Sequence, residues 1–376
     1  MSYNDSVNQP MDKPIVEVHG LKKYFPIKSS FFKMTVGNVQ AVDDVSFNIA
    51  AGTTLGVVGE SGCGKTTMGR TMLRLYPITD GAVLYRGLSL DKLTNSQLKK
   101  ALPEEVDDAV VADRDSMLAY FEENGIDINR LSRSALNKLR PDIQIIFQDP
   151  YSSLSPRLPV GEIIGEAVRE HKIVPPEEFD DYITEIMLAC GLQEYHKDRY
   201  PHEFSGGQRQ RICIARALAM KPKVVVCDEP VSALDVSIQA QIINLLKDLQ
   251  KERGLTYIFI SHDLSVVQHI SDNVAVMYLG SLVELTSKEA LFANPMHPYT
   301  TALLSAIPVP DPDVKMNRIV LEGDLPSPAN PPAGCKFHTR CNRCTERCIN
   351  EAPALKEYEP GHFVACHLYD KENSAE

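Results

Sequence analysis

The chain has 376 residues, 43% of them hydrophobic and 24% charged, which is typical of folded globular proteins. This length suits two domains, or one large α/β domain with an appendage. The formal net charge of −11 argues against nucleic acid as a partner, because binding to phosphates needs an excess of basic residues. No apolar run approaches the ~18 residues of a membrane-spanning helix and the N-terminus has no secretion signal, so we expect membrane contact only through partner chains.

The first half of the chain predicts strands, a glycine-rich turn and an insertion. Alternating β-branched residues predict strands from Ile15 to Val58, and a helix is predicted from Thr66 to Leu75. Residues 95–135 combine many acidic side chains with apolar positions, which indicates an inserted subdomain of short helices with a solvated acidic surface. A short strand, IQIIF, then leads into a mostly helical subdomain over about 150–220.

The second half returns to alternating strands and helices. The run Val224–Cys227 predicts a buried parallel strand, and residues 236–253 predict an amphipathic helix that ends at Gly254. Such alternation predicts an α/β fold with a parallel sheet covered by helices. From Met296 the sequence has three proline-rich connections, HPY, IPVPDPD and LPSPANPPAG, in which we expect no regular helix or strand. We therefore divide the chain into a domain of residues 1–295 and an extension of residues 296–376.

The residues GESGCGKT, from Gly59 to Thr66, fit the pattern of a phosphate-binding loop between a strand and a helix. The glycines allow successive N–H groups to point at nucleotide phosphates, Lys65 adds a positive charge and the Thr66 hydroxyl is suited to Mg²⁺. The alternative for this pattern alone is a glycine-rich turn with an incidental lysine. The residues predicted to contact ATP here are Gly59, Ser61, Gly62, Cys63, Gly64, Lys65, Thr66 and Thr67.

Two adjacent carboxylates, Asp228 and Glu229, follow the predicted strand Val224–Cys227. Ligands of parallel sheets collect at the carboxyl ends of the strands. We predict that Asp228 holds Mg²⁺ and that Glu229 orients and deprotonates the attacking water. Taken alone, the pair is equally compatible with a solvated strand end.

The segment FSGGQRQR, which starts at Phe204 and precedes the helical stretch ICIARALAM, resembles the ATPases of ABC transporters. The resemblance implies the ABC-type P-loop fold, with a RecA-like parallel core, an antiparallel β subdomain and a helical subdomain. It also implies a dimer in which this segment faces the γ-phosphate bound to the opposite subunit, as a helix N-terminus can. The residues that would do so are Ser205, Gly206, Gly207 and Gln208.

Three further matches to ABC ATPases occur in the order of that family. They are Gln148 in IIFQDP, Asp235 shortly after Glu229, and His262 in ISHD. The resemblance implies that Gln148 senses Mg²⁺ and the membrane partner, that Asp235 helps to align the dimer, and that His262 contacts the γ-phosphate. An aromatic residue near the start should stack on adenine, and the spacing favours Phe25 over Tyr24.

The stretch HPYTTALLSAIP and the later LPSPANPPAGCKFHTRC are similar to the C-terminal extension of oligopeptide and dipeptide importer ATPases. The stretches KKYFPIK and VGESGCGKTTMGR look more like the second of the two ATPase subunits of those importers. The resemblance implies a heterodimer with the other ATPase, two permease subunits, an extracytoplasmic peptide-binding protein and a position at the cytoplasmic face of the membrane. The alternatives are a soluble ABC ATPase and a metal-sensing regulatory ATPase.

Five of the nine cysteines lie in the last 42 residues of the chain, from Cys335 on, and this crowding suggests metal ligation rather than disulfides. In the importer subfamily that this tail resembles, four tail cysteines can bind an iron–sulfur cluster, so the resemblance implies such a site here. Four thiolates suit a [4Fe–4S] cluster or zinc, and reduced thiols without a metal are the third possibility. Cys344 forms a Cys-x-x-Cys pair with Cys341, which leaves the ligand set open. The matching positions are Cys335, Cys341, Cys348 and Cys366.

Overall fold

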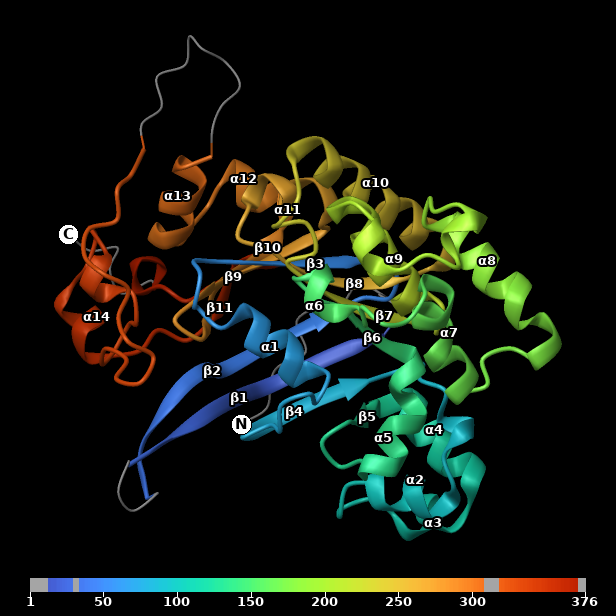
Figure 1. Cartoon of the computed structure of the whole chain (residues 1–376). Coiled ribbons are helices and arrows are strands. Elements are labelled where there is room, and N and C mark those ends of the chain that lie inside the picture. Colours follow the sequence, from blue (N-terminus) through green and yellow to red (C-terminus); the bar gives the residue numbers. More distant parts are fainter. Residues whose placement is uncertain (1–12, 30–33, 308–317, 371–376) are drawn as a thin grey trace.

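The computed structural model describes residues 13–29, 34–307 and 318–370, in which two sheets are surrounded by helices (Figure 1). The larger sheet has eight strands in the order β11-β12-β10-β9-β3-β8-β7-β6. Five neighbouring strands of it run parallel and form the predicted core. These strands are β3 (Thr54–Val58), β6 (Ile143–Ile146), β7 (Val224–Asp228), β8 (Thr256–Ile260) and β9 (Asn273–Tyr278).

The parallel strands are buried on both faces, because alternate side chains enter two different hydrophobic clusters. In β7, Val225 and Cys227 pack into the cluster that holds the apolar side of α10, whereas Val224 and Val226 pack into the cluster around α1 and the second sheet. This two-sided burial explains why the strand has no polar position before Asp228. The helices of the core are α1 (Lys65–Met72), α10 (Val236–Arg253) and α11 (Leu264–Ile270).

The second sheet is antiparallel and has the order β2-β1-β4-β5. Its two long strands form a hairpin that extends away from the core (Figure 1). Register irregularities along this hairpin allow it to bend over the phosphate-binding loop. The strands are β1 (Val16–Lys28), β2 (Thr35–Ile49), β4 (Asp80–Tyr85) and β5 (Ile126–Asp127).

The acidic insertion folds into short helices and contributes β5, which pairs with β4 at the edge of the antiparallel sheet. Phe121 and Met117 are buried in the same hydrophobic cluster as the strands of that sheet. Part of the acidic composition has a local cause, since the side chains of Asp107 and Asp113 cap two of the helices. The helices are α2 (Asn95–Ala101), α3 (Asp108–Ala112), α4 (Arg114–Asn124) and α5 (Arg133–Leu139).

The helices between β6 and β7 in the chain form a separate group, which contains the FSGGQRQR segment. Its helices pack on one another around a shared apolar cluster. They are α6 (Pro150–Ser153), α7 (Val160–Glu170), α8 (Phe179–Ala189) and α9 (Gly206–Leu218). None of the helices in the described ranges combines the length and apolarity that a bilayer crossing requires.

The expectation of no regular structure is wrong for HPY, which leads into a helix, and is confirmed for LPSPANPPAG, residues 325–334, which form no helix or strand. Residues 308–313 of IPVPDPD lie outside the described ranges. Pro298 occupies the first turn of a helix, where its missing N–H costs nothing, and His297 caps that helix. Strand β12 pairs with β10, so the extension continues the large sheet. Before Met296 lie β10 (Ser281–Ser287) and α12 (Lys288–Ala293). After it lie α13 (Pro298–Ser305), α14 (Glu346–Asn350), β11 (Lys356–Glu359) and β12 (His362–Val364). The division at residue 296 stays a prediction.

Candidate nucleotide-binding site

A cleft of about 430 Å³ opens where β3, β7 and β8 end, at the carboxyl edge of the parallel sheet. Segments that are distant in sequence meet there, as expected for a nucleotide site of a parallel sheet. The residues that line it are Val39, Ala41, Ser61, Gly62, Gly64, Lys65, Thr66, Thr67, Gln148, Glu229, His262 and Pro328.

The phosphate-binding loop connects β3 to α1. At Gly64 the backbone has φ of 106°, and a Cβ atom would come within 2.1 Å of the carbonyl oxygen of Ala41. Only glycine fits this close approach. The ammonium of Lys65 donates to the carbonyl oxygens of Gly59 at 2.7 Å and Glu60 at 3.0 Å, which holds it at the centre of the loop. The loop therefore presents a buried positive charge at the N-terminus of a helix, which is an arrangement suited to phosphate.

The predicted Mg²⁺ ligands lie together beside this loop. The Thr66 hydroxyl donates to a carboxylate oxygen of Asp228 at 2.6 Å. Asp228 is fully buried, and its other oxygen lies 3.3 Å from the guanidinium of Arg70. A hydroxyl and a carboxylate beside a phosphate site are oxygen donors of the kind that Mg²⁺ prefers, so these residues fit that ion.

Glu229 lies at the junction of the predicted catalytic residues. Its backbone has φ of 48°, a left-handed conformation that is unusual for a residue with a side chain and that ends β7. The side-chain amide of Gln148 donates to Oε2 of Glu229 at 2.8 Å. The same oxygen lies 3.2 Å from Nδ1 of His262. Three predicted residues from separate segments therefore meet at one carboxylate oxygen.

Three residues predicted to contact the nucleotide, Gly59, Cys63 and Phe25, do not line the cleft. Cys63 is buried beneath the loop, and burial raises the pKa of its thiol. Phe25 packs edge-on against Tyr76 with ring centroids 5.5 Å apart. In the β1–β2 pairing, however, Phe25 lies opposite Val39, which does line the cleft. Tyr24 is instead hydrogen-bonded to Asp43 through its hydroxyl.

The Ser-Gly-Gly-Gln segment lies outside the cleft of its own chain. Ser205 is exposed and caps α9, accepting a hydrogen bond from the main chain of Gln208, whose side chain accepts one from Ser205 in return. Gly207 packs tightly on Ile238, since a Cβ atom there would come within 2.5 Å of that side chain. Asp235 is also exposed, at the start of α10. Neither segment completes the site of its own chain.

Sequence reasoning missed four residues of the site. Val39 and Ala41 on β2, and Pro328 in the extension, line the cleft, and Arg70 pairs with Asp228. The contributions of β2 and of the extension depend on long-range packing, for which no local sequence signal exists. Arg70 had a signal, because it lies one helical turn after Thr66 and so shares its face of α1.

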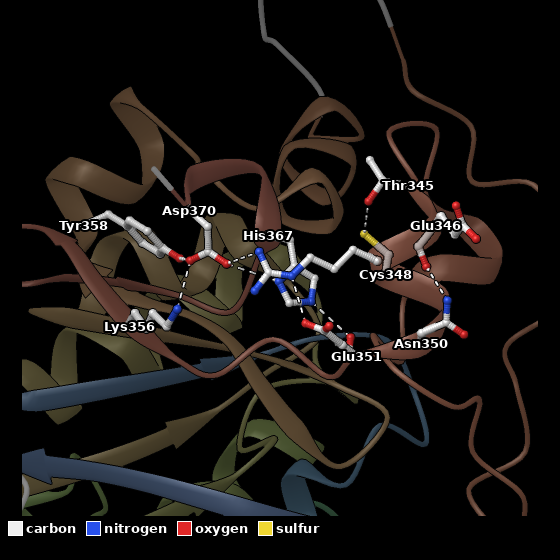
Figure 2. A network of polar contacts seen from close by, with 10 residues as sticks. Thr345, Glu346, Cys348, Asn350, Glu351, Lys356, Tyr358, His367 and Asp370 are labelled. Carbon is white, nitrogen blue, oxygen red and sulfur yellow. Dashed lines mark hydrogen bonds and ion pairs between the residues drawn. The ribbon is translucent and has the colours of Figure 1, made fainter. Parts of the chain in front are cut away.

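In the described ranges, no group of three or more His, Cys, Asp or Glu side chains is arranged to hold a metal ion. The cysteines of the extension are nevertheless neighbours. Burial raises the pKa of Cys366 to about 12, and the charges of Cys335, Cys341 and Cys348 act in the same direction. The hydroxyl of Thr345 lies 3.2 Å from the sulfur of Cys348, as Figure 2 shows.

Comparison with known proteins assigns the class of this site. The family model described as "ABC transporter" matches residues 42–232, which include the phosphate-binding loop, the FSGGQRQR segment and Glu229. The chain is therefore an ATP-binding cassette protein, and such cassettes hydrolyse ATP. A second family model, described as "Oligopeptide/dipeptide transporter, C-terminal region", matches residues 283–348. The chain belongs to the family of oligopeptide and dipeptide ABC transporter ATP-binding proteins.

Relatives resemble the chain over nearly its whole length. The oligopeptide transport ATP-binding protein AppF of Bacillus subtilis is 50% identical over 94% of this chain and 97% of its own. The putative oligopeptide transport ATP-binding protein YkfD of the same species is 48% identical, over 95% of this chain and 96% of its own. A probable peptide ABC transporter ATP-binding protein of Sinorhizobium fredii, y4tS, is 46% identical, over 95% and 91%.

Solved structures share the fold of the cassette. One of them is cbiO1 from Clostridium perfringens, part of the ABC transporter complex cbiONQ. It has a TM-score of 0.55 and 26% identity, and the match covers 75% of this chain and 92% of that chain. A dimeric cassette, MJ0796, bound to ADP and Pi in a post-hydrolysis state, has a TM-score of 0.55, 25% identity and coverage of 73% and 98%. The predicted P-loop fold of the ABC type is confirmed.

Proposed function

We propose that this chain is the ATP-hydrolysing subunit that energises the import of oligopeptides or dipeptides. The observation that carries the proposal is the cleft in which Lys65, the Thr66–Asp228 pair and Glu229 meet, in a chain whose extension matches the peptide transporter family. Peptide import requires partners that cross the membrane. The chain would work with two permease subunits and an extracytoplasmic peptide-binding protein, at the cytoplasmic face of the membrane.

The geometry supports a division of roles in hydrolysis. Lys65 and the loop N–H groups bind the phosphates of ATP, and Thr66, Asp228 and Gln148 would hold Mg²⁺, which neutralises phosphate charge when bound. Glu229 orients the attacking water and accepts its proton. His262 lies 3.2 Å from the same carboxylate oxygen of Glu229 that Gln148 contacts, and it stabilises charge that develops on the γ-phosphate.

The nucleotide is proposed to lie between two chains. Ser205 and Asp235 are exposed and do not line the cleft of their own chain, as expected of residues that serve a neighbouring site. The MJ0796 cassette, which shares the fold, is dimeric with ADP and Pi. We expect Ser205, Gly206, Gly207 and Gln208 of one chain to close on the ATP held by another. The second chain would be a different ATPase subunit, which makes the pair a heterodimer.

The extension of residues 296–376 is proposed to hold a [4Fe–4S] cluster through Cys335, Cys341, Cys348 and Cys366, with zinc as the alternative. The support is that the main-chain N–H of Cys335 donates to the carbonyl oxygen of Cys348 at 2.8 Å, which brings two of the four positions together. The main-chain N–H of Arg343 also donates to the sulfur of Cys341 at 3.4 Å, a contact that stabilises a thiolate. The role of such a group would be structural. Cys344 remains outside the proposed set because its side chain is exposed.

Co-purification from detergent-solubilised membranes tests the assignment. A tagged chain should bring down two permease chains and a second ATPase. Recovery of a lone chain with normal ATPase activity would favour a soluble ABC ATPase or a metal-sensing regulatory ATPase instead. These alternatives are not favoured, because the relatives that match over almost the whole chain carry names of peptide transport proteins.

A further inference from the structure

Glu60, the second residue of the phosphate-binding loop, is held on three sides. Its main-chain N–H donates to the hydroxyl of Tyr299 at 2.8 Å. Its carboxylate receives two hydrogen bonds from the guanidinium of Arg340, at 2.7 and 3.2 Å. Its carbonyl oxygen accepts a hydrogen bond from the ammonium of Lys65 at 3.0 Å. Two residues of the C-terminal region thus contact the residue that also holds the phosphate-binding lysine.

The Tyr299 contact comes from a well-fixed part of the molecule. Tyr299 is buried in an aromatic cluster with Tyr278 and Phe337, at centroid distances of 4.8 and 5.4 Å. Nδ1 of His297 accepts a hydrogen bond from the main-chain N–H of Tyr299 at 3.1 Å, which fixes the start of α13. The N–H of His297 is itself bonded to the buried carboxylate of Glu284 on β10. The position of the Tyr299 hydroxyl is therefore set by the sheet and not by solvent.

The Arg340 contact is fixed by a second attachment four residues earlier in the chain. Lys336 donates to Asp43 at 2.8 Å and to Ser281 at 2.7 Å. The Arg340 side chain is only 8% exposed, against 28% for Glu60, so little water screens the pair. Loss of either partner would leave a poorly solvated charge. The Arg340–Glu60 contact is thus a specific, partly desolvated ion pair.

The remainder of the extension is held together by a polar network, which Figure 2 shows around Asp370. Asp370 accepts hydrogen bonds from Lys356 at 2.9 Å and Tyr358 at 2.8 Å. The ring of His367 lies 3.3 Å from Asp370 and 3.0 Å from the carbonyl oxygen of Glu351. These bonds join both ends of the segment 351–370. This segment is also attached to the large sheet, because β12 pairs with β10.

We propose that Tyr299 and Arg340 are positioning residues for ATP: they fix the Glu60 peptide, which in turn fixes the Lys65 ammonium that meets the phosphates. The inference rests on the proposed assignment of the Lys65 loop as the phosphate site. The inference gives two residues of the peptide-transporter extension a role in nucleotide binding. It also gives a physical reason for the sequence His297-Pro298-Tyr299: a cap, a helix start and a hydroxyl aimed at the loop.

Steady-state kinetics of the reconstituted transporter test the proposal. Tyr299→Phe removes one hydroxyl and keeps the ring, and Arg340→Met removes the charge. Each should raise the KM for ATP by about 5- to 50-fold, the effect of leaving a buried hydrogen-bonding group without its partner, while kcat changes less than about twofold. Arg340→Lys should recover part of the loss. Tyr257→Phe is the matched control, because it also loses one buried hydroxyl bond, to Leu246 at 3.0 Å, away from the loop.

A double-mutant cycle and a binding assay separate the outcomes. The effects of Glu60→Gln and Arg340→Met on KM should be less than additive, because both remove the same contact. If Tyr299→Phe and Arg340→Met lower the melting temperature like Tyr257→Phe but leave KM unchanged, the proposal is overturned. Binding of a fluorescent ATP analogue to Lys65→Ala tests separately whether the Lys65 loop is the phosphate site. Normal binding by Lys65→Ala would reject the phosphate site itself, and with it the positioning role.

Discussion

Gln148 donates its side-chain amide hydrogen to Oε2 of Glu229 across 2.8 Å. The two residues are 81 positions apart, on segments that follow β6 and β7, and these strands are paired in the sheet. The hydrogen bond therefore connects the proposed base to the segment that leads into the helical subdomain. A change in the position of that segment would move the hydrogen-bond partner of the base.

Glu229→Gln tests the proposed base. The amide has the same shape as the carboxylate but does not accept a proton from water. We expect ATP binding to stay within about twofold and turnover to fall by about 10²- to 10⁴-fold, the usual contribution of a general base. The variant should also accumulate as an ATP-bound dimer, visible by size-exclusion chromatography of the purified ATPase pair. Turnover close to that of the wild type would show that another group takes the proton.

Phe25→Ala tests the proposed adenine contact. Stacking of a base on an aromatic ring contributes about 1–3 kcal/mol, so the KM for ATP should rise by roughly 5- to 100-fold. Tyr24→Phe is the control, because it removes only the hydroxyl that bonds to Asp43. Phe25, by contrast, pairs with Val39 and so lies beside the cleft. Tyr24→Ala, which removes the ring, should raise the KM less than Phe25→Ala does; a larger effect of Tyr24→Ala would exchange the two assignments.

His297→Asn tests the pH dependence of stability. Burial lowers the pKa of His297 from 6.5 to about 4, so the folded state keeps the imidazole neutral where the unfolded chain takes up a proton. The stability that this group contributes is present above pH 6.5 and is lost as the pH falls toward 4, a loss of about 2 kcal/mol by pH 5. Asn retains a helix cap without titrating, so its melting temperature should depend less on pH between 7 and 5. If the melting temperatures of the wild type and of His297→Asn change equally between pH 7 and 5, His297 is not the group responsible for the pH dependence.

Phe121→Ala tests whether the acidic insertion belongs to the main core. Phe121 is 2% exposed and packs in the cluster that includes the antiparallel sheet. We expect a loss of about 3–5 kcal/mol in the free energy of unfolding, as for other buried phenylalanines. Glu122→Ala, at the neighbouring exposed position, should change it by less than about 0.5 kcal/mol. Similar denaturant midpoints for the two variants would show that the insertion folds independently of the core.

Cys335→Ser tests the proposed metal site. The wild-type chain, purified without oxygen, should contain iron and acid-labile sulfide, or zinc if that is the native ion. Cys335→Ser should lose most of the metal, whereas Cys344→Ser should keep it, because Cys344 is exposed and outside the proposed ligand set. Metal-free wild-type protein with full ATPase activity would leave the cysteines as reduced thiols. Metal loss in Cys344→Ser would change the ligand set.

The sequence by itself determined the class of site. The glycines and lysine from Gly59 to Lys65 specify a phosphate-binding turn locally, because a tight loop before a helix needs positive φ and a free helix end. The apolar run before Asp228 likewise predicted a buried parallel strand, since such a strand needs apolar residues on both faces. Patterns of this kind act over a few residues, so the local sequence is enough to identify them.

Only the tertiary structure decided which distant residues meet. Val39 and Pro328 enter the cleft, and Tyr299 and Arg340 reach Glu60, through packing between segments that are 239 and 280 residues apart. The proline-rich connection HPY appeared unable to form a helix or strand, yet Pro298 begins α13. Proline disfavours regular structure inside an element but not at its first turn, and which of these applies depends on the neighbours that the fold supplies.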